Sequence, residues 1–560
     1  MAVVPLVLEL DLLTPMATTP PQDPLSALRA RNRTHLTDVI EGLRRGARDQ
    51  HVGGLIAQCD GAAYSPATAQ ELREAVREFR RSGKPAVAWA QSFGELAPGT
   101  VGYFLATAFD EIWLQPSGDI GLTGLNARAV FLREALDRLG LHPELGQRYE
   151  YKNAADTFTQ AEFTEAHRES LGRIVESTGD QLLEAVCKSR GIAIERVREL
   201  INSGIIGAAA AKSAGLIDHV GYRDEAYTSM ARRVGGRMRL RYVGRYNQSA
   251  VKSRAMLAPV TRKRGCVALI YGHGPVTVGR SSASPMSGGS MGSETISASL
   301  RAAARDESVK SIVFRVDSPG GSYVASDTIR REVLQARRAK PVIASMGAVA
   351  GSGGYFVSMG ADVVVAAPAT ITGSIGVLAG KMVIKKLLTR LGVRMDSVSV
   401  GEQAGMFSPS EPFTDAQWEI IDRWLDGVYD DFVAKVAHDR GMARDDVHSV
   451  AKGRIWTGAD AHRHGLVDQL GGLVTAVGLA RIRGGLPARN DLSDVRTFPK
   501  VSLLDRMRPA ESSQSPAATS VVMRAWGPMT HLAAALGLPA AGPLTMPFSL
   551  NTAKSLGEWK

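Results

Sequence analysis

The feature that most constrains this chain is an internal repeat. Residues 49–60 (DQHVGGLIAQCD) and 306–317 (DESVKSIVFRVD) each have the pattern of a short buried strand that ends in an acidic turn. An amphipathic helix is predicted after both, because apolar residues recur there at the spacing of one helical face. These residues are Leu72, Val76 and Phe79 in the first half and Ala325, Ile329 and Val333 in the second. Such a repeat means that each half must build a core of its own.

The repeat continues through most of the 560 residues. Short segments of the two halves match in the same order, namely 99–104 with 351–356, 110–116 with 362–368 and 215–218 with 465–468. The repeated regions are about 35–235 and 265–485. Because strands alternate with helices in both, each half is predicted to form a parallel sheet from β-α-β crossovers. The predicted fold class is therefore α/β, with two tandem domains that arose by internal duplication.

The repeat and the local composition together predict the domain boundaries. We expect an N-terminal extension at 1–34, an N-terminal domain at 35–240 and a basic, irregular linker at 241–264. A C-terminal domain is expected at 265–490. The Pro/Ser/Ala-rich residues 491–560 have the composition of a flexible tail.

Charge and cysteine content narrow the classes of partner and cofactor. The formal net charge is +11, but the basic residues are dispersed, which favours a solvated surface over a nucleic-acid-binding patch. The three cysteines are scattered and no His/Cys/carboxylate cluster has metal-ligand spacing, so neither a metal nor a cofactor is expected. The N-terminus lacks the pattern of a signal peptide, and no stretch of about 18 apolar residues predicts a membrane span. The expected location is cytoplasmic, or peripheral at an anionic membrane surface.

Three motifs in the second half combine small residues with a serine. Asp-Ser-Pro-Gly-Gly at 317–321 closes a predicted strand, and its glycines allow backbone N–H groups to turn toward a ligand. Gly-Ser-Gly-Gly-Tyr at 351–355 places Ser352 where a helix can begin, and Thr-Gly-Ser-Ile-Gly-Val follows at 372–377. A serine between glycines is by itself as typical of a turn as of a nucleophile. In this order and spacing, the three motifs together resemble signal peptide peptidase A, also called protease IV.

The resemblance implies a ClpP/crotonase-like fold for each half and a lysine, rather than a histidine, that activates Ser352. In single-unit relatives this lysine follows the serine, but the corresponding stretch here, 401–405, contains none. Ungapped alignment of the halves puts Lys152 opposite Ala404 and Thr100 opposite Ser352. Each half therefore lacks one member of the dyad. The large, duplicated form of the family implies one composite site, with Ser352 as nucleophile and Lys152 as general base.

The resemblance also implies roles for four more residues. Ser374 matches a family serine that hydrogen-bonds the lysine and orients it. The backbone N–H groups of Gly353 and of Gly320 or Gly321 are expected to stabilise the oxyanion. Lys152 must be neutral to accept a proton, so burial must lower its pKa from about 10.4.

Substrates and partners follow from the same resemblance. We expect the enzyme to degrade cleaved signal peptides or other short, apolar, unfolded peptides, bound as extended strands. A ring-like homo-oligomer, specifically a tetramer, is implied as well. No nucleic-acid partner is expected.

Three other interpretations fit parts of the pattern. Crotonase-type acyl-CoA enzymes share the expected fold but lack a Ser/Lys pair. A Ser/His/Asp site would need His51, His273 or His438, none of which has a recognisable spacing to Ser352. A non-catalytic scaffold that binds peptides or membrane surfaces would keep the glycine-rich turns for folding alone.

Overall fold

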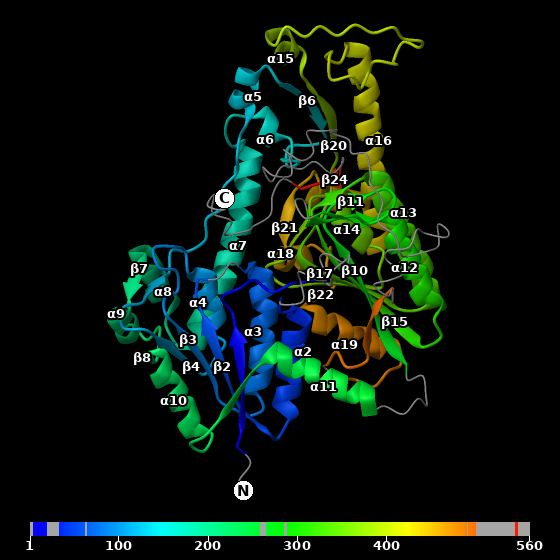
Figure 1. Ribbon diagram of the computed structural model, residues 1–560. Helices are drawn as coiled ribbons and strands as arrows, with labels where there is room; N and C mark the ends of the chain where they lie inside the picture. The colour runs from blue at the N-terminus through cyan, green and yellow to red at the C-terminus, as the bar shows by residue number, and fades with distance from the viewer. Residues whose placement is uncertain are drawn as a thin grey trace.

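The computed structural model describes residues 4–19, 33–61, 64–257, 265–284, 288–489, 491–499 and 544–546. Within these ranges the two halves of the chain form two α/β domains, which lie side by side (Figure 1). All six residues of the two predicted apolar stripes are buried. The predicted fold class, α/β with two tandem domains, is therefore confirmed.

The N-terminal domain is built on a six-stranded parallel sheet with the strand order β8-β4-β3-β2-β1-β9. Its strands are β1 (Leu6–Asp11), β2 (Val52–Cys59), β3 (Ala86–Ala90), β4 (Glu111–Leu114), β8 (His219–Val220) and β9 (Arg239–Tyr242). All of β3 is buried, because helices cover both faces of the sheet. One face carries α2 (Leu36–Arg48), α3 (Pro66–Arg80) and α4 (Thr100–Ala106), and the other carries α10 (Arg223–Arg233).

The C-terminal domain repeats this arrangement. Its sheet has the order β21-β19-β17-β15-β10-β23, with β18 also paired to β17 and β22 paired to β18. The strands are β10 (Cys266–His273), β15 (Val309–Ser318), β17 (Val342–Gly351), β18 (Val363–Ala366), β19 (Ile371–Gly373), β21 (Ile455–Thr457), β22 (Gln469–Leu470) and β23 (Val495–Phe498). One face carries α12 (Ser293–Arg305), α13 (Tyr323–Ala339) and α14 (Gly353–Ser358), and the other carries α19 (Leu473–Arg483).

Two long helices occupy equivalent positions in the halves. Both α7 (Glu165–Arg190) and α16 (Asp415–Arg440) begin after a threonine whose hydroxyl accepts a backbone N–H of the first turn. Both end at a glycine in the left-handed conformation, which closes a helix at little steric cost. Helix α7 lies against β21 of the other domain, where the Ser177 and Thr457 hydroxyls are 2.9 Å apart.

Shorter elements complete the fold. In the first half they are α5 (Arg133–Leu139), α6 (Asp156–Thr159), α8 (Ile194–Ser203), α9 (Ala208–Ser213), β5 (Asp119–Gly121), β7 (Ile205–Gly207) and α11 (Val243–Leu257). In the second half they are α15 (Lys385–Arg390), α17 (Arg444–Val450), α18 (Gly458–Arg463), β12 (Ala283–Ser284) and β13 (Gly288–Gly289). A small separate sheet joins β14 (Met291–Gly292), β11 (Val276–Thr277), β16 (Gly320–Gly321) and β24 (Leu544–Thr545) in that order.

One strand pair crosses between the domains. Strand β6 (His142–Gln147) of the N-terminal half pairs antiparallel with β20 (Leu378–Val383) of the C-terminal half. This ladder fixes the register of the chain that leaves β6. The residues directly after β6 are thereby held against the C-terminal domain.

Three of the expected segments outside the domains contain secondary-structure elements that pair or pack with the domains. The expected extension 1–34 contains β1, which pairs with both β2 and β9 inside the first sheet. The expected linker 241–264 contains the end of β9 and the helix α11, which packs on α2. The expected tail 491–560 supplies β23 and β24, while most of its other residues lie outside the described ranges. These strands pair with partners far along the chain, so local periodicity alone does not mark them.

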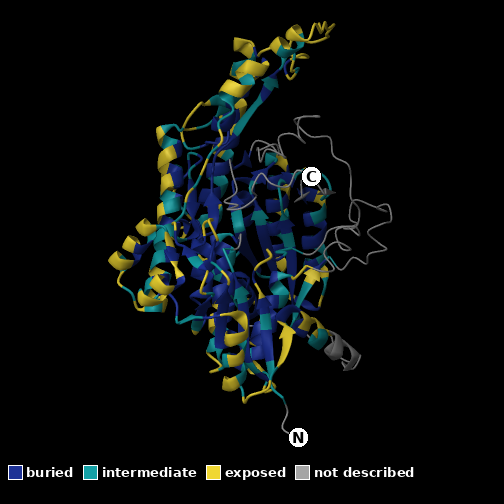
Figure 2. Cartoon of the chain, turned by 60° about the vertical axis from the view of Figure 1, so that its left-hand side comes forward, coloured by how far each residue is buried: buried dark blue, intermediate teal, exposed yellow. Residues whose placement is uncertain are grey.

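An arm formed by residues 384–412 and α5 projects from the body of the molecule and is largely exposed (Figure 2). Its exposed apolar residues include Val398, Val400 and Phe407, with relative exposures of 103%, 98% and 70%. None of the helices in the described ranges has the length and apolar character that a membrane crossing requires.

A buried ion pair joins the domains, and its loss is expected to destabilise the protein. The Arg315 side chain on β15 donates to Glu71 Oε1 on α3 at 2.6 Å, and both side chains are less than a tenth exposed. Replacing Glu71 by alanine leaves a buried charge without its partner, which costs about 3–5 kcal/mol of unfolding free energy. Chemical denaturation measures this loss. The exposed pair Arg196–Glu199 offers the control, because Glu199→Ala should change stability by less than about 1 kcal/mol. Equal effects of the two substitutions would contradict the expectation.

Candidate active site

Three side chains from the two domains meet in one buried cluster. Lys152 Nζ lies 2.8 Å from Ser352 Oγ and 3.0 Å from Ser374 Oγ, and it donates to the Ser374 carbonyl oxygen at 3.2 Å. Lys152 follows β6 in the N-terminal half, whereas the two serines belong to the C-terminal domain. The structure thus brings together the three residues that sequence reasoning had selected from both halves.

The lysine has no opposite charge to stabilise it. No ion pair involves Lys152 among the described residues, and its relative exposure is 0%. Burial disfavours the charged ammonium and lowers the pKa of Lys152 from 10.5 to about 7. A large fraction of the side chain is therefore neutral at neutral pH, so that its nitrogen can accept a proton.

Ser352 stands on a strained turn between β17 and α14. Its φ is 54° and its ψ is −114°, outside the regions that side-chain-bearing residues usually adopt. Its backbone N–H donates to the Gly373 carbonyl oxygen at 2.8 Å, which holds the turn against β19. The hydroxyl makes no helix-capping hydrogen bond and is directed to the lysine instead.

Backbone strain is concentrated around this cluster. Five non-glycine residues in the described ranges have positive φ, and four of them contact or adjoin the site, namely Tyr149, Ser352, Ser374 and Lys452. Each such conformation costs about 1–3 kcal/mol and persists only where the surroundings impose it. Concentration of this cost at one place is typical of a functional site.

Two glycines that sequence reasoning missed make room for the lysine. Gly453 has φ +86°, and a Cβ there would lie 2.4 Å from the backbone nitrogen of Lys152. A Cβ on Gly376 would lie 3.2 Å from Lys152 Cδ. The backbone of Lys452 also accepts a hydrogen bond from the Tyr151 N–H at 3.2 Å. Gly376 does fall in the Thr-Gly-Ser-Ile-Gly-Val motif, but no local signal pointed to Gly453.

The three glycines expected to supply oxyanion donors lie together beside Ser352. A Cβ on Gly320 would be 2.8 Å from the Gly353 nitrogen, and one on Gly353 would be 3.0 Å from the Gly321 nitrogen. Gly320 and Gly321 have φ values of +102° and +153°. Gly353 begins α14, whose first N–H groups have no acceptor within the helix.

Among its described residues, the first half has no equivalent cluster. Thr100 is buried at the start of α4, and its φ is not positive. A β-branched residue such as threonine would be strongly strained in the backbone conformation that Ser352 adopts. Asp119 stands at the position of Ser374 and accepts from the Ser92 hydroxyl at 2.6 Å. Ala404, opposite Lys152 in the alignment, is exposed on the arm.

The three histidines considered from the sequence have other partners than Ser352. His51 and His438 are hydrogen-bonded to Asp49 and Asp439, and His273 is 4.0 Å from Asp317. In the part of the chain that the structure describes, the Ser352 hydroxyl is hydrogen-bonded to Lys152 and to no histidine. A Ser/His/Asp arrangement is therefore not formed.

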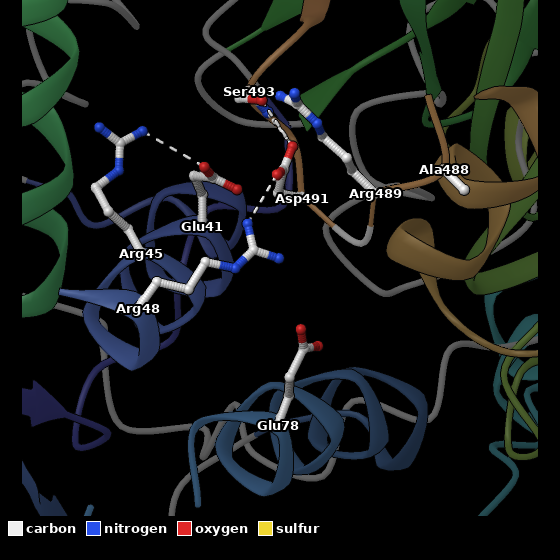
Figure 3. Close-up of a pocket in the computed structure, with 8 residues that line it drawn as sticks. All are labelled: Glu41, Arg45, Arg48, Glu78, Ala488, Arg489, Asp491 and Ser493. Atoms are coloured by element: carbon white, nitrogen blue, oxygen red, sulfur yellow. Dashed lines mark hydrogen bonds and ion pairs between the residues drawn. The ribbon is translucent and has the colours of Figure 1, made fainter. Parts of the chain in front are cut away.

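A charged cavity of about 680 Å³ lies elsewhere, between α2, α3 and the residues Ala488, Arg489, Asp491 and Ser493 (Figure 3). Its lining residues largely neutralise one another, since Arg48 pairs with Asp491 and Arg45 with Glu41. None of them belongs to the Ser352 cluster. Across the described ranges, no group of three or more His, Cys, Asp or Glu side chains is arranged to hold a metal ion.

Comparison with known proteins gives one family. The model of peptidase family S49 matches residues 78–236 and 335–486, one range in each half. The chloroplastic serine protease SPPA of Arabidopsis thaliana is 30% identical over 482 residues, which cover 85% of this chain and 68% of that protein. Protease 4 of Salmonella typhi is 30% identical over 457 residues, which cover 80% of this chain and 71% of that protein.

A solved structure of similar fold is a mutant of the 1510-N membrane-bound stomatin-specific protease. It is 15% identical to this chain and covers 42% of it, with a TM-score of 0.27. The match spans 99% of that shorter protein.

Proposed function

Since the chain belongs to peptidase family S49 and is a serine protease, we propose that it hydrolyses peptides with a Ser/Lys dyad formed across its two domains. Ser352 is the nucleophile in this proposal and Lys152 is the general base. The observation that carries it is the 2.8 Å contact between Lys152 Nζ and Ser352 Oγ in a fully buried setting.

The hydrogen bonds around the lysine suit this role. A neutral amine has two N–H groups and one lone pair. Its two N–H groups match the two acceptors that Ser374 offers, its carbonyl oxygen and its hydroxyl oxygen. The lone pair is then left for the hydroxyl proton of Ser352. Ser374 acts in this way as a positioning residue that aims the lysine.

The reaction proceeds in two balanced steps. As Ser352 Oγ bonds to the peptide carbonyl carbon, its proton moves to Lys152 Nζ, and N–H groups of Gly353 and of Gly320 or Gly321 stabilise the oxyanion. The C–N bond then breaks, and Lys152 returns the proton to the leaving amine. Water attacks the acyl-enzyme while Lys152 takes its proton, and Ser352 regains that proton when the acid product leaves.

We propose short apolar peptides, including cleaved signal peptides, as the substrate class. The names of the similar proteins, SPPA and Protease 4, support this class. We also propose a homo-oligomer, a tetramer, in which the arm contacts another copy. The exposed apolar residues Val398, Val400 and Phe407 support such a contact, since monomers seldom expose such groups together. Sedimentation analysis of the purified chain measures the assembly directly.

The pH profile of peptide cleavage tests the dyad. Lysine acts as a base only when neutral, and the neutral fraction rises with pH through its pKa. Because burial lowers the pKa of Lys152 to about 7, kcat/KM should rise about tenfold per pH unit below pH 7 and level off above it. A fluorogenic apolar peptide assayed from pH 5 to pH 9 gives this curve.

Lys381 provides the matched control. It is also buried, its Nζ donates to the Met406 carbonyl oxygen at 2.8 Å, and desolvation lowers its pKa as well. Lys381→Met should leave the profile unchanged. A profile that is flat between pH 6 and pH 8, or one that moves with Lys381→Met, would show that Lys152 is not the base.

A further inference from the structure

Residues 544–546 lie along Gly320 and Gly321, which adjoin Ser352 in the candidate active site. Strand β24, which is labelled in Figure 1, pairs antiparallel with β16. In this pairing Leu544 lies opposite Gly321 and Thr545 lies opposite Gly320. The backbone N–H of Met546 continues this ladder and donates to the Pro319 carbonyl oxygen at 2.8 Å. The three residues 544–546 have relative exposures of 3% or less, so the segment is buried in the protein.

The side chain of Met546 fills an apolar pocket beside the nucleophile. A Cβ on Gly351, the residue before Ser352, would lie 2.0 Å from Met546 Sδ. The other residues of this apolar cluster come from both domains: Ile174, Val349, Ile371 and Ile455. The pocket therefore belongs to the same composite site as the Lys152–Ser352 pair.

The glycine pair makes room for the backbone of this segment. A Cβ on Gly320 would lie 1.9 Å from the Leu544 carbonyl oxygen and 2.8 Å from the Gly353 nitrogen. The segment thus runs over the same glycines whose N–H groups would stabilise an oxyanion. Strand addition to such an edge is how an extended peptide binds, with backbone hydrogen bonds giving affinity and pockets reading the side chains.

We propose that residues 544–546 occupy the substrate groove as an intramolecular competitor, with Met546 in the pocket that receives an apolar side chain of the substrate. The proposal rests on the assignment of Ser352 and Lys152 as the dyad. The segment is part of the same chain, so its effective concentration is of order millimolar and a substrate must displace it. Proline precedes the segment at 543 and follows it at 547. Because proline has no N–H, neither position can extend the ladder by donating.

Peptide binding without chemistry tests the proposal. The probe is a fluorescein-labelled peptide with the sequence Pro-Leu-Thr-Met, and the protein is the full chain carrying Ser352→Ala. Adding Met546→Asp should tighten binding of the probe about fivefold or more. The carboxylate is excluded from the apolar pocket, so residues 544–546 leave the groove and the probe can bind there. Met523→Asp, which places the same charge elsewhere in the tail, should leave the affinity unchanged. Met546→Ala should give a smaller gain in the same direction.

Cleavage by the otherwise unaltered chain gives the second readout. Met546→Asp should raise kcat/KM for a short apolar peptide by the same factor, through a lower KM and an unchanged kcat. Equal or weaker probe binding with Met546→Asp, in a chain that unfolds at the normal temperature, would overturn the proposal. The binding assay needs no catalysis. If Lys152 and Ser352 are not the dyad, variants of Lys152 will keep their activity. If residues 544–546 do not compete with the substrate, Met546→Asp will leave the affinity for the probe unchanged.

Discussion

Replacing Lys152 by methionine is expected to lower kcat for peptide cleavage by about 10³-fold or more and, at pH 6, to make the protein more stable. The loss of activity follows because the Ser352 hydroxyl has no other base within hydrogen-bonding reach among the described residues. Methionine matches the length and apolar stem of the lysine, so the buried site is filled without a cavity.

The gain in stability follows from the pKa of the buried lysine. Its pKa is about 7 in the folded protein against 10.5 as its ordinary value. Between these pH values the unfolded chain binds a proton that the folded chain does not, so the stability of the unsubstituted protein rises with pH. At pH 7 and below, the buried charge costs of order 3–5 kcal/mol. Methionine avoids this cost.

Thermal unfolding at pH 6 and pH 10 measures the effect. The methionine variant should unfold at the higher temperature at pH 6, and the difference from the unsubstituted chain should shrink toward pH 10. A variant that loses both activity and stability at pH 6 would point to a structural role for the lysine, and one that keeps its activity would remove Lys152 from the mechanism.

Replacing Ser352 by alanine is the second substitution with a large expected effect. Peptide cleavage should fall by about 10³-fold or more, and a serine-reactive phosphonate should no longer label the protein. The duplication offers a matched control, because Thr100 is the aligned and likewise buried hydroxyl of the first half. Thr100→Ala should keep kcat within about twofold of the unsubstituted value.

Labelling and turnover are measured on the same preparations. If the phosphonate still labels Ser352→Ala, the nucleophile is another residue, which peptide mapping of the adduct would identify. If Thr100→Ala also loses activity, the two halves share more of the site than their alignment indicates.

Much of the fold could be predicted because the chain repeats. The buried strands β2 and β15 and the stripes of α3 and α13 carry strong local patterns, and their occurrence twice makes the topology of each half explicit. The pairing of Lys152 with Ser352 also came from the repeat, since each half lacks what the other retains. The two residues are 200 positions apart in the sequence, yet Lys152 Nζ and Ser352 Oγ lie 2.8 Å apart.

Other parts had no local pattern to reveal them. Strands β9 and β23 lie at sheet edges and β1 lies between β2 and β9, and all three depend on partners far along the chain. The close approach of Gly453 to Lys152 exists only when the domains dock. Segment 544–546 sits in a tail whose composition suggested flexibility, but it pairs with β16 of the C-terminal domain. Contacts of this kind are set by tertiary structure, so sequence periodicity does not record them.

The division of the proposed dyad between two domains has a consequence for the synthesis of the protein. The half that carries Lys152 leaves the ribosome first and has no nucleophile of its own. At 5–20 residues per second, the 200 positions from Lys152 to Ser352 take about 10–40 s to synthesise. During that interval the emerging chain cannot cleave itself or its neighbours. In the proposed mechanism, proteolysis therefore cannot begin until the second domain has folded and docked on the first.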